Sequence, residues 1–451
     1  MISTPSGKAA ALLPIAPASK FERVPSLDIV RGAALLGILA INIQLFAGSP
    51  SIAFNMPLRV VTFTGQHPIL NAGVMVLQWL FFEGKMRALF SMLFGAGSLL
   101  LLSRIESREG AGVAADIFHR RNMWLLLFGI LHGTLIWNGD VLLFYASVAL
   151  LALYPLRHLT GRWLVGSGLA LALVGGTFGV GNAMDVPTAW SAAQLEEGAQ
   201  DALARGDRPT QAQADAVASA RAERRDQIDR LKAAPVPPAG SYINSIPAAA
   251  YRSFVAAIFT SGWILETLGF LIAGMGLFKT GFLTGRLSSA TYARIAALGY
   301  AIAFPLILGG LAHAYRYGFS SNVTTVAMML PYELQTIAAS LANASILLLL
   351  VRRGAMMPLQ RALAAVGRMA LTNYIATSAI CRGIFTWTSI LPTGTLEQYQ
   401  MMLVVAAVWT FNISLSLVWL RLFHFGPLEW LWRSLTYWKL QPMLPVRRRP
   451  A

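Results

Sequence analysis

The chain has 451 residues, of which 56% are hydrophobic and only 12% charged, and its mean hydropathy is +0.57. Since an ordinary soluble domain carries roughly 25% charged residues, this composition excludes a soluble globular protein and indicates a polytopic membrane protein. The formal charge of +16 does not indicate nucleic-acid binding, because the lysines and arginines gather in short loops between apolar runs.

Apolar runs of membrane-spanning length recur along the chain, and their lack of strict alternation predicts helices rather than barrel strands. We therefore predict an all-α fold, a polytopic transmembrane helical bundle of about eleven spans (ten to twelve) with one soluble polar insertion. The second and third spans are separated only by EGKMR and could instead form a re-entrant hairpin. The predicted spans are 27–46, 69–83, 87–103, 122–137, 141–156, 163–182, 251–278, 292–312, 323–351, 363–390 and 400–421.

The basic residues of alternate loops predict the orientation of the bundle, because positively charged loops are retained in the cytoplasm. The loops at 138–140, 313–322 and 392–398 are poor in charge and should face outward. With eleven spans the C-terminus is then cytoplasmic and the N-terminus extracytoplasmic. Lys8, Lys20 and Arg23 argue against this N-terminal side, and ten spans or a re-entrant second segment would place the N-terminus inside. The arginine-rich loops contain Arg104, Arg108, Arg120, Arg121, Arg157, Arg162, Lys279, Arg286, Arg294, Arg352, Arg353, Arg361, Arg447, Arg448 and Arg449.

Residues 183–245 form the one polar insertion, rich in Ala, Gln, Asp, Glu and Arg. Alternating charges predict one or two solvated helices, ended by Pro235, Pro237 and Pro238, on the extracytoplasmic side; a substrate cap is the alternative. The first 25 residues lack the pattern of a cleavable signal peptide, so we expect 27–46 to remain as a span. The predicted organisation is an N-terminal tail (1–26), an N-terminal transmembrane half (27–182), the insertion (183–245), a C-terminal transmembrane half (246–422) and a basic cytoplasmic tail (423–451).

Several kinds of chemistry have no support in the residues. Cys381 is the only cysteine, and the six histidines show no HExxH spacing, so we expect no disulfide and no metal site. The sequence contains no phosphate-binding loop, no GxSxG elbow and no nucleic-acid module. The small residues GAGS at 95–98 and the pair Gly269/Gly274 predict close helix packing.

Ionisable residues of four segments are predicted to meet in the outer leaflet. They are Asp28 and Arg31 of the first span, Arg87 after the second, His132 near the end of the fourth, and Asp140 in the following turn. His132 is the candidate general base, because imidazole accepts and returns a proton near neutral pH and Asp28 or Asp140 could orient it. The alternatives are a headgroup-level ion pair for Asp28 and Arg31, and a structural, hydrogen-bonded histidine.

A second polar group lies deeper or toward the inner side, at Glu266, Glu333 and Arg382. A carboxylate inside a span must be protonated, paired or in contact with water, and Arg382 is a reasonable partner for Glu266. The alternative is a buried pair that only fixes helix register.

Arginines at the predicted inner surface could bind phosphate by bidentate hydrogen bonds. They could equally serve only as topology signals or contacts for anionic lipid. This set is Arg120, Arg121, Arg352, Arg353 and Arg368.

Five motifs in order carry a resemblance to a known family. They are RVPSLDIVRGAALLGILAINI (23–43), FEGKMRALFSMLFGAG (82–97), RRNMWLLLFGILHGTLIWNGDVLLFYA (120–146), GRMALTNY (367–374) and GPLEWLWR (426–433). In these the chain resembles the YeiB family of bacterial inner-membrane proteins nearly end to end, apart from 183–245. The resemblance implies a multi-pass protein of the bacterial inner (plasma) membrane, with a C-terminal domain of unknown function.

The LDxxRGxAL opening, the FSMLFG segment and the RR-span-GD pattern are more distantly similar to the transmembrane acyltransferase superfamily, which includes heparan-α-glucosaminide N-acetyltransferase. That resemblance implies transfer of an acyl group from cytosolic acyl-CoA to an acceptor across the membrane. In the bacterial sugar acyltransferases the opening helix carries a histidine where this chain has Asn42. Since Asn42 cannot act as a base, His132 would have to take that role.

These observations favour a membrane acyltransferase. Acyl-CoA would be the co-substrate, held by the five inner arginines with Asn373 of GRMALTNY, and the acceptor would be an extracytoplasmic hydroxyl or amine. His132 would deprotonate it, Asp28 or Asp140 would orient His132, and Arg31 or Arg87 would stabilise developing charge. Membrane lipids are the other expected partners, nucleic acid is not, and a homo-oligomer stays open.

A proton-coupled transporter or flippase is the alternative function. Asp28, Arg31, Glu266, Glu333 and Arg382 would then line a pathway, and Pro305 and Pro331 would suit broken helices. A non-catalytic membrane scaffold is a third possibility, supported by the missing histidine at Asn42.

Overall fold

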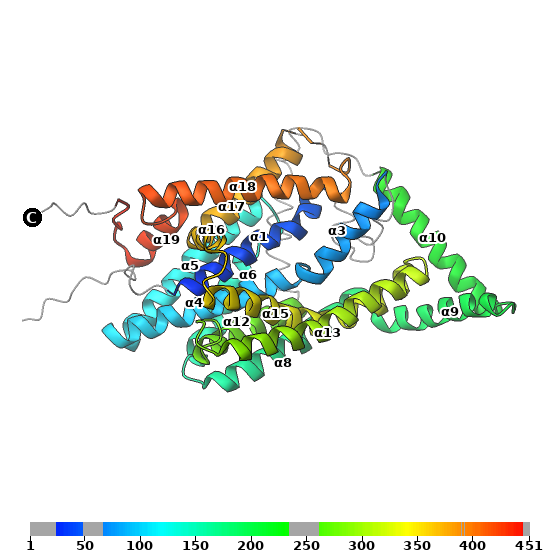
Figure 1. Cartoon of the computed structure of the whole chain (residues 1–451), viewed down its shortest axis with the longest axis horizontal. Coiled ribbons are helices and arrows are strands. Elements are labelled where there is room, and N and C mark those ends of the chain that lie inside the picture. The colour runs from blue at the N-terminus through cyan, green and yellow to red at the C-terminus, as the bar shows by residue number, and fades with distance from the viewer. Residues whose placement is uncertain (1–23, 48–65, 234–260, 389, 392, 445–451) are drawn as a thin grey trace, which may run out of the picture.

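The computed structural model describes residues 24–47, 66–233, 261–388, 390–391 and 393–444 (Figure 1). Every regular element within these ranges is a helix, which confirms the predicted all-α class. The α-helices are α1 (Pro25–Ala47), α3 (Pro68–Phe81), α4 (Lys85–Glu109), α5 (Ala111–Leu135), α6 (Leu142–Val148), α7 (Tyr154–Leu156), α8 (Gly161–Met184), α9 (Val186–Ala204), α10 (Gln211–Ala233), α12 (Ser261–Lys279), α13 (Ser289–Arg316), α14 (Ser321–Thr324), α15 (Tyr332–Arg352), α16 (Met357–Arg368), α17 (Ala370–Arg382), α18 (Gln398–Leu422) and α19 (Pro427–Tyr437). Three π-helical turns are η3 (Ala149–Leu153), η4 (Thr325–Met329) and η5 (Gly383–Trp387).

Some predictions fall outside the described residues. These are the N-terminal tail as far as residue 23, with Lys8, Lys20 and Arg23, the prolines after the insertion, the first part of the 251–278 span, and the arginines at 447–449.

Six helical segments of the described ranges are long and apolar enough to cross a membrane. They are α1, the α3–α4 segment taken as one, α12, α13, α15 and α18. A stretch of about 20 apolar residues spans the hydrocarbon as a helix, which satisfies its own backbone hydrogen bonds there. The chain is therefore a multi-pass helical membrane protein, as the composition predicted.

The second and third predicted spans form one broken crossing. The N-terminal end of α3 is tied to the start of α18, where the amide of Asn71 donates to Glu397 over 3.0 Å. The last turns of α4, with Arg104 and Arg108, line a cavity together with His424, which follows the end of α18. Because α3 and α4 together cover the length of the single helix α18, they cross once (Figure 1). If this segment counts as one crossing, ten of the eleven predicted spans remain as predictions, within the expected range.

The start of α1 lies at the same end of the bundle as the end of α18. Asp28 in the first turns of α1 lines the cavity with Arg433 of α19, whereas Gln44 near the end of α1 donates to Gln78, which also bonds Gln398 at the start of α18. The ten-span alternative, with both termini on one side, agrees with this arrangement.

Glycines allow the central helices to approach closely, as the small-residue pattern predicted. A side chain at Gly95 of α4 would collide with the Leu271 carbonyl of α12, and one at Gly274 of α12 would collide with the Met92 carbonyl of α4. The backbones of α4 and α12 therefore touch, which places the charged residues of both helices side by side.

The polar insertion forms the two helices α9 and α10, at the end of the bundle away from α19 (Figure 1). Polar contacts fasten α9 to the bundle: His313 lies 2.8 Å from Glu197, and Arg316 lies 3.0 Å from Asp201. The sequence predicted helices in this insertion. The contacts with His313 and Arg316 attach it to the end of α13.

Candidate functional site

A cavity of about 740 Å³ opens among α1, α4, α5, α17 and α19. Its polar lining is strongly basic, with six arginines against three carboxyl groups, while leucines and phenylalanines form the remaining wall. The arginines are Arg31, Arg104, Arg108, Arg121, Arg368 and Arg433, and the acids are Asp28, Glu109 and Glu429. Such a volume is typical of small-molecule sites, and the excess of arginine favours an anionic ligand.

The close crossing of α1 and α16 holds the first ion pair of the chain at this cavity. Gly32 and Gly367 lie where the two backbones meet, since a side chain on either would collide with the carbonyl of Leu363 or Asp28. Arg31 donates to Asp28 over 2.9 Å and to the Gly367 carbonyl over 3.4 Å. The i,i+3 spacing thus forms the expected pair, and its second contact joins α1 to the GRMALTNY motif.

The GPLEWLWR motif closes one side of the cavity by capping another helix. The Glu429 carboxylate accepts hydrogen bonds from the backbone nitrogens of Leu371 (2.6 Å) and Thr372 (3.0 Å) and from the Thr372 hydroxyl (2.6 Å). These nitrogens belong to the first turn of α17, whose N-cap residue Met369 has no side-chain bond to offer. Burial raises the pKa of the Glu429 carboxyl, and the Thr372 and Leu371 donors partly oppose that rise.

Arg121 is held at the cavity wall by an aromatic partner. Its guanidinium lies 3.6 Å from the ring centroid of Trp432, whose indole nitrogen donates to the Arg121 carbonyl over 2.9 Å. A stacked arginine keeps its hydrogen-bond donors in one plane and available at the edge. Arg121 is therefore pre-oriented for an anionic group in the cavity.

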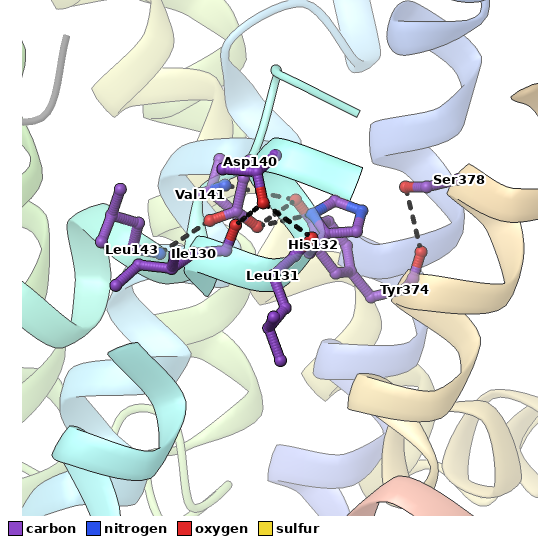
Figure 2. Close-up of polar contacts among 9 residues, drawn as sticks. Ile130, Leu131, His132, Asp140, Val141, Leu143, Tyr374 and Ser378 are labelled. Carbon is purple, nitrogen blue, oxygen red and sulfur yellow. Dashed lines mark hydrogen bonds and ion pairs between the residues drawn. The ribbon is translucent and has the colours of Figure 1, made fainter. Parts of the chain in front are cut away.

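Tyr374 of α17 lines the cavity and separates it from a buried histidine–aspartate pair. Its hydroxyl contacts Asp140 Oδ1 at 3.4 Å and accepts from the Val141 nitrogen at 3.2 Å, while its ring lies 4.9 Å from that of His132 (Figure 2). The cavity thus ends one side chain away from the pair.

Of the two acids that could orient His132, the structure places Asp140 beside it and Asp28 at the cavity. His132 Nδ1 lies 2.7 Å from Asp140 Oδ1, and both side chains are almost fully buried (Figure 2). Asp140 Oδ2 accepts from the Leu143 nitrogen over 2.7 Å, so the start of α6 fixes the carboxylate. The geometry supports the tautomer with a proton on Nδ1, which leaves the Nε2 lone pair open. His132 Nε2 is buried and has no hydrogen-bond partner among the described residues.

Glycine at position 129 gives the pair its space. A side chain there would collide with the Leu143 nitrogen and come within 3.0 Å of Asp140 Oδ2. The turn that follows α5 can therefore fold back so that residues eight apart in the chain face each other.

The structure divides the predicted outer cluster into three places. Asp28 and Arg31 lie at the arginine-rich cavity, His132 and Asp140 lie beyond Tyr374, and Arg87 pairs with Glu266 over 2.5 Å. The expectation of one shared outer site is therefore corrected. The predicted depth of these residues assumed that α3 and α4 cross the membrane separately. Because α3 and α4 form one broken crossing, the start of α1 lies on the opposite side of the membrane from the predicted one.

The expected partner of Glu266 is also corrected. Arg87 of α4, not Arg382, forms its ion pair, whereas Arg382 donates to Thr386 over 3.2 Å. Since α12 packs closely against α4 through glycine contacts, Glu266 meets the arginine of that helix.

Of the predicted donor-binding residues, Arg121 and Arg368 line the cavity and the others lie elsewhere. Arg120 donates to the Thr436 carbonyl and pairs with Asp116, and Arg352 donates to the Gly285 carbonyl over 2.8 Å. The other two, Arg353 at the exposed end of α15 and Asn373, which donates to Ser416 over 2.8 Å, do not belong to the cavity wall either.

Sequence reasoning did not assign a site role to Arg104, Arg108, Arg433 or Tyr374. The first two were read as topology signals only, although their i,i+4 spacing places them on one helical face. Tyr374 ends the GRMALTNY motif, but nothing in a single sequence indicates that it approaches Asp140.

The fold and the cavity define the class: a multi-pass helical membrane protein with an arginine-rich cavity that ends beside a buried His–Asp pair. The chain is 30% identical over 424 residues to the uncharacterized protein YeiB of Escherichia coli (strain K12), covering 92% of this chain and 96% of the relative. It is 27% identical to the uncharacterized protein YxaH of Bacillus subtilis (strain 168), covering 94% and 96% of the two chains. The chain belongs to the YeiB family.

The C-terminal part also matches a family model. Residues 277–439 match the family model DUF418, which is described as a protein of unknown function. This range contains α13 to α19 and therefore Tyr374, Glu429 and Arg433. No solved structure matches the chain.

Proposed function

We propose that the protein is an acyltransferase of the bacterial inner membrane, in which acyl-CoA enters the arginine-rich cavity from the cytosol. The observation that carries this proposal is the cavity itself, which runs from arginines at the basic end to Tyr374 beside the His132–Asp140 pair. The distant resemblance of the LDxxRGxAL, FSMLFG and RR-span-GD segments to the transmembrane acyltransferase superfamily supports the same assignment.

The orientation follows from the positive-inside rule. Arg104 and Arg108 line the cavity with Val24, just before α1, and His424, just after α18; Arg157 bonds Glu106 between them, and Lys279 bonds the Arg157 carbonyl. Cytoplasmic loops retain lysine and arginine, so this end faces the cytosol, with both termini inside. The α9–α10 insertion at the opposite end is then extracytoplasmic.

The two parts of the cavity suit the two parts of an acyl-CoA. Arginines bind phosphates bidentately, and Arg121 and Arg433 lie on the wall near the basic end. Apolar side chains such as Phe90, Leu125 and Leu142 line the way toward Tyr374 and suit the acyl end of the donor. The acceptor, a hydroxyl or amine compound, reaches the other side of the His–Asp pair from outside.

His132 acts as the general base in this proposal. Its Nε2 takes the proton of the acceptor group, the acceptor oxygen or nitrogen attacks the thioester carbonyl, and the bond to sulfur breaks. The CoA thiolate leaves and takes the proton back from the imidazolium. Asp140 holds the tautomer of His132 and stabilises the imidazolium. Of the two arginines expected to stabilise developing charge, Arg31 lines the cavity and Arg87 does not, so Arg31 stabilises charge on the donor. Tyr374 has to turn aside to admit the acyl group.

Two experiments test the proposal separately. Purified protein should bind acetyl-CoA, and failure to bind any acyl-CoA would rule out the donor. Conversion of His132 to Ala should abolish acyl transfer without abolishing that binding, and full transfer by this variant would rule out the base. His158→Ala, on an exposed histidine near Glu106, is the matched control.

A proton-coupled transporter is the second candidate, and one observation favours it. The α3–α4 crossing is broken beside Glu83, Lys85 and Glu333, which are all buried. Broken helices with charged groups at membrane depth are typical of transporter sites. Solute flux driven by a pH gradient in proteoliposomes, without consumption of acyl-CoA, would favour this function over transfer.

A further inference from the structure

Tyr374 closes the inner end of the cavity with a hydroxyl group that two partners hold loosely. The hydroxyl donates to Asp140 Oδ1 over 3.4 Å and accepts from the Val141 nitrogen over 3.2 Å (Figure 2). Bonds donated by hydroxyl groups are usually 2.5–3.0 Å long, and those donated by N–H groups 2.7–3.2 Å. Both contacts therefore lie at or beyond the long end of their range, so an entering polar group can replace the Tyr374 hydroxyl.

Two backbone N–H groups of the turn after α5 meet side chains, and they are held very differently. The Leu143 N–H donates to Asp140 Oδ2 over 2.7 Å, and this bond fixes the carboxylate. The Val141 N–H donates to the Tyr374 hydroxyl, its acceptor among the described residues. When Tyr374 turns aside, Val141 is therefore left with a free donor, whereas Leu143 stays committed to Asp140.

This donor lies close to both the cavity and the candidate base. Leu142, the next residue after Val141, lines the cavity together with Tyr374. The Tyr374 ring lies 4.9 Å from that of His132, whose buried Nε2 has no hydrogen-bond partner in the described part of the chain. Asp140 Oδ1 contacts both the Tyr374 hydroxyl and His132 Nδ1. An acyl group that replaces the Tyr374 side chain thus arrives beside an N–H donor and an unpaired imidazole nitrogen.

We infer that the Tyr374 hydroxyl is an internal stand-in for the thioester carbonyl oxygen, and that the Val141 N–H binds this carbonyl when Tyr374 turns aside. The inference rests on the proposed transferase function and adds the group that meets the reacting carbonyl. As the acceptor atom attacks the carbonyl carbon, the second electron pair of the C=O bond moves to the oxygen, and the Val141 N–H stabilises this negative oxygen. The pair returns when the carbon–sulfur bond breaks and the CoA thiolate leaves.

Competition between Tyr374 and the donor can be measured by comparing acetyl-CoA with CoA. Only acetyl-CoA carries a carbonyl at this end, so only its binding requires displacement of the hydroxyl. Tyr374→Phe should therefore tighten acetyl-CoA binding by about 2- to 10-fold relative to CoA binding, the value of one hydrogen bond. Isothermal titration of the full chain in lipid nanodiscs, without an acceptor, gives both dissociation constants.

Tyr145→Phe is the matched control, because it removes a hydroxyl from another buried tyrosine close to this turn. The Tyr145 hydroxyl lies 2.8 Å from that of Ser91, and neither residue lines the cavity. This variant should keep the wild-type ratio of the two dissociation constants. An unchanged or lowered preference for acetyl-CoA in Tyr374→Phe would overturn the inference.

Infrared spectroscopy of bound, isotope-labelled acetyl-CoA identifies the hydrogen-bond donor. A bound carbonyl that accepts a hydrogen bond absorbs at lower frequency than a free one, and this shift should persist in Tyr374→Phe. Val141→Pro, which has no N–H, should lose it. If Val141→Pro fails to fold, Tyr374→Phe still decides, because loss of the shift there would make the tyrosine hydroxyl the donor and overturn the inference.

The same experiments separate this inference from the proposed function. Failure of the wild-type protein to bind acetyl-CoA would overturn the transferase proposal, and the roles of Tyr374 and Val141 with it. Binding of acetyl-CoA with the same preference over CoA in wild type and Tyr374→Phe would overturn those two roles alone.

Discussion

The cavity and the α3–α4 break are both built on α4, yet their charges are arranged in opposite ways. In the cavity six arginines face three carboxyl groups, and the walls leave about 740 Å³ of space. At the break Glu83, Lys85, Glu266 and Glu333 are buried, and Glu266 pairs with Arg87. A positive excess around open space favours an anionic ligand, whereas buried charges of both signs compensate one another.

The largest effect in this comparison is expected at the end of the cavity. His132→Gln should lower acyl transfer by about 10²- to 10⁴-fold, because general-base catalysis contributes that much. Release of CoA thiol from acetyl-CoA, measured in inverted membrane vesicles, reports the rate. His158→Gln should behave as wild type, and an equal loss in both variants would mean that His132 has no special role.

The basic wall of the cavity should show the next largest effect. Arg121→Gln should weaken CoA binding by about 10- to 100-fold, since a charge-assisted hydrogen bond contributes about 1.5–3 kcal/mol. Isothermal titration with CoA measures this change. The neighbouring Arg120→Gln is the matched control, because Arg120 bonds Thr436 and lies outside the cavity. Comparable weakening by both variants would contradict a specific site.

The packing that sets the two regions side by side can be broken at a glycine. Gly95→Ala forces the α4 and α12 backbones apart and should destabilise the protein by about 1–3 kcal/mol. Thermal unfolding in detergent reports the loss. Gly97→Ala, on the same helix, would meet its nearest neighbour only at 3.8 Å, at Arg31, and should be tolerated. If both variants are equally stable, the close contact is not a constraint.

The smallest effect is expected at Glu429, from the pH dependence of its contribution to stability. Glu429 lies in α19, outside the membrane-crossing helices. Glu429→Gln removes the cap of α17 and should lower the unfolding temperature by a few degrees. Burial raises the pKa of this carboxyl in the folded protein. Its stabilising contribution is therefore complete below the unfolded pKa of about 4.3 and is lost as pH rises through the folded value.

The measurement is the unfolding temperature of the wild type minus that of the Glu429→Gln variant, taken across the pH range. This difference should narrow as pH rises. A difference that widens instead would show that hydrogen bonds from Thr372 and Leu371 outweigh burial at Glu429.

Much of the fold could be predicted because hydropathy and chain length act locally. The long apolar runs indicated helices, and the polar composition of 183–245 indicated the α9–α10 insertion. The break in α3–α4 could be suspected from EGKMR but not resolved, because a short polar turn can either reverse a helix or only bend it. Because the prediction treated this turn as a reversal, it placed Asp28 and Arg31 on the opposite side of the membrane from the one that the structure indicates.

The sequence by itself determined the membrane class and the helices, and it made Asp140, eight residues from His132, one of two candidate partners of that histidine. Tertiary structure decided which charges meet over long distances: Glu266 with Arg87, Glu429 with α17, and the arginines of four helices and the α16 terminus around one cavity. The reason is physical. Periodicity shows which face of a helix is apolar, but the partner of a buried charge depends on which helices are neighbours and on the depth at which they cross.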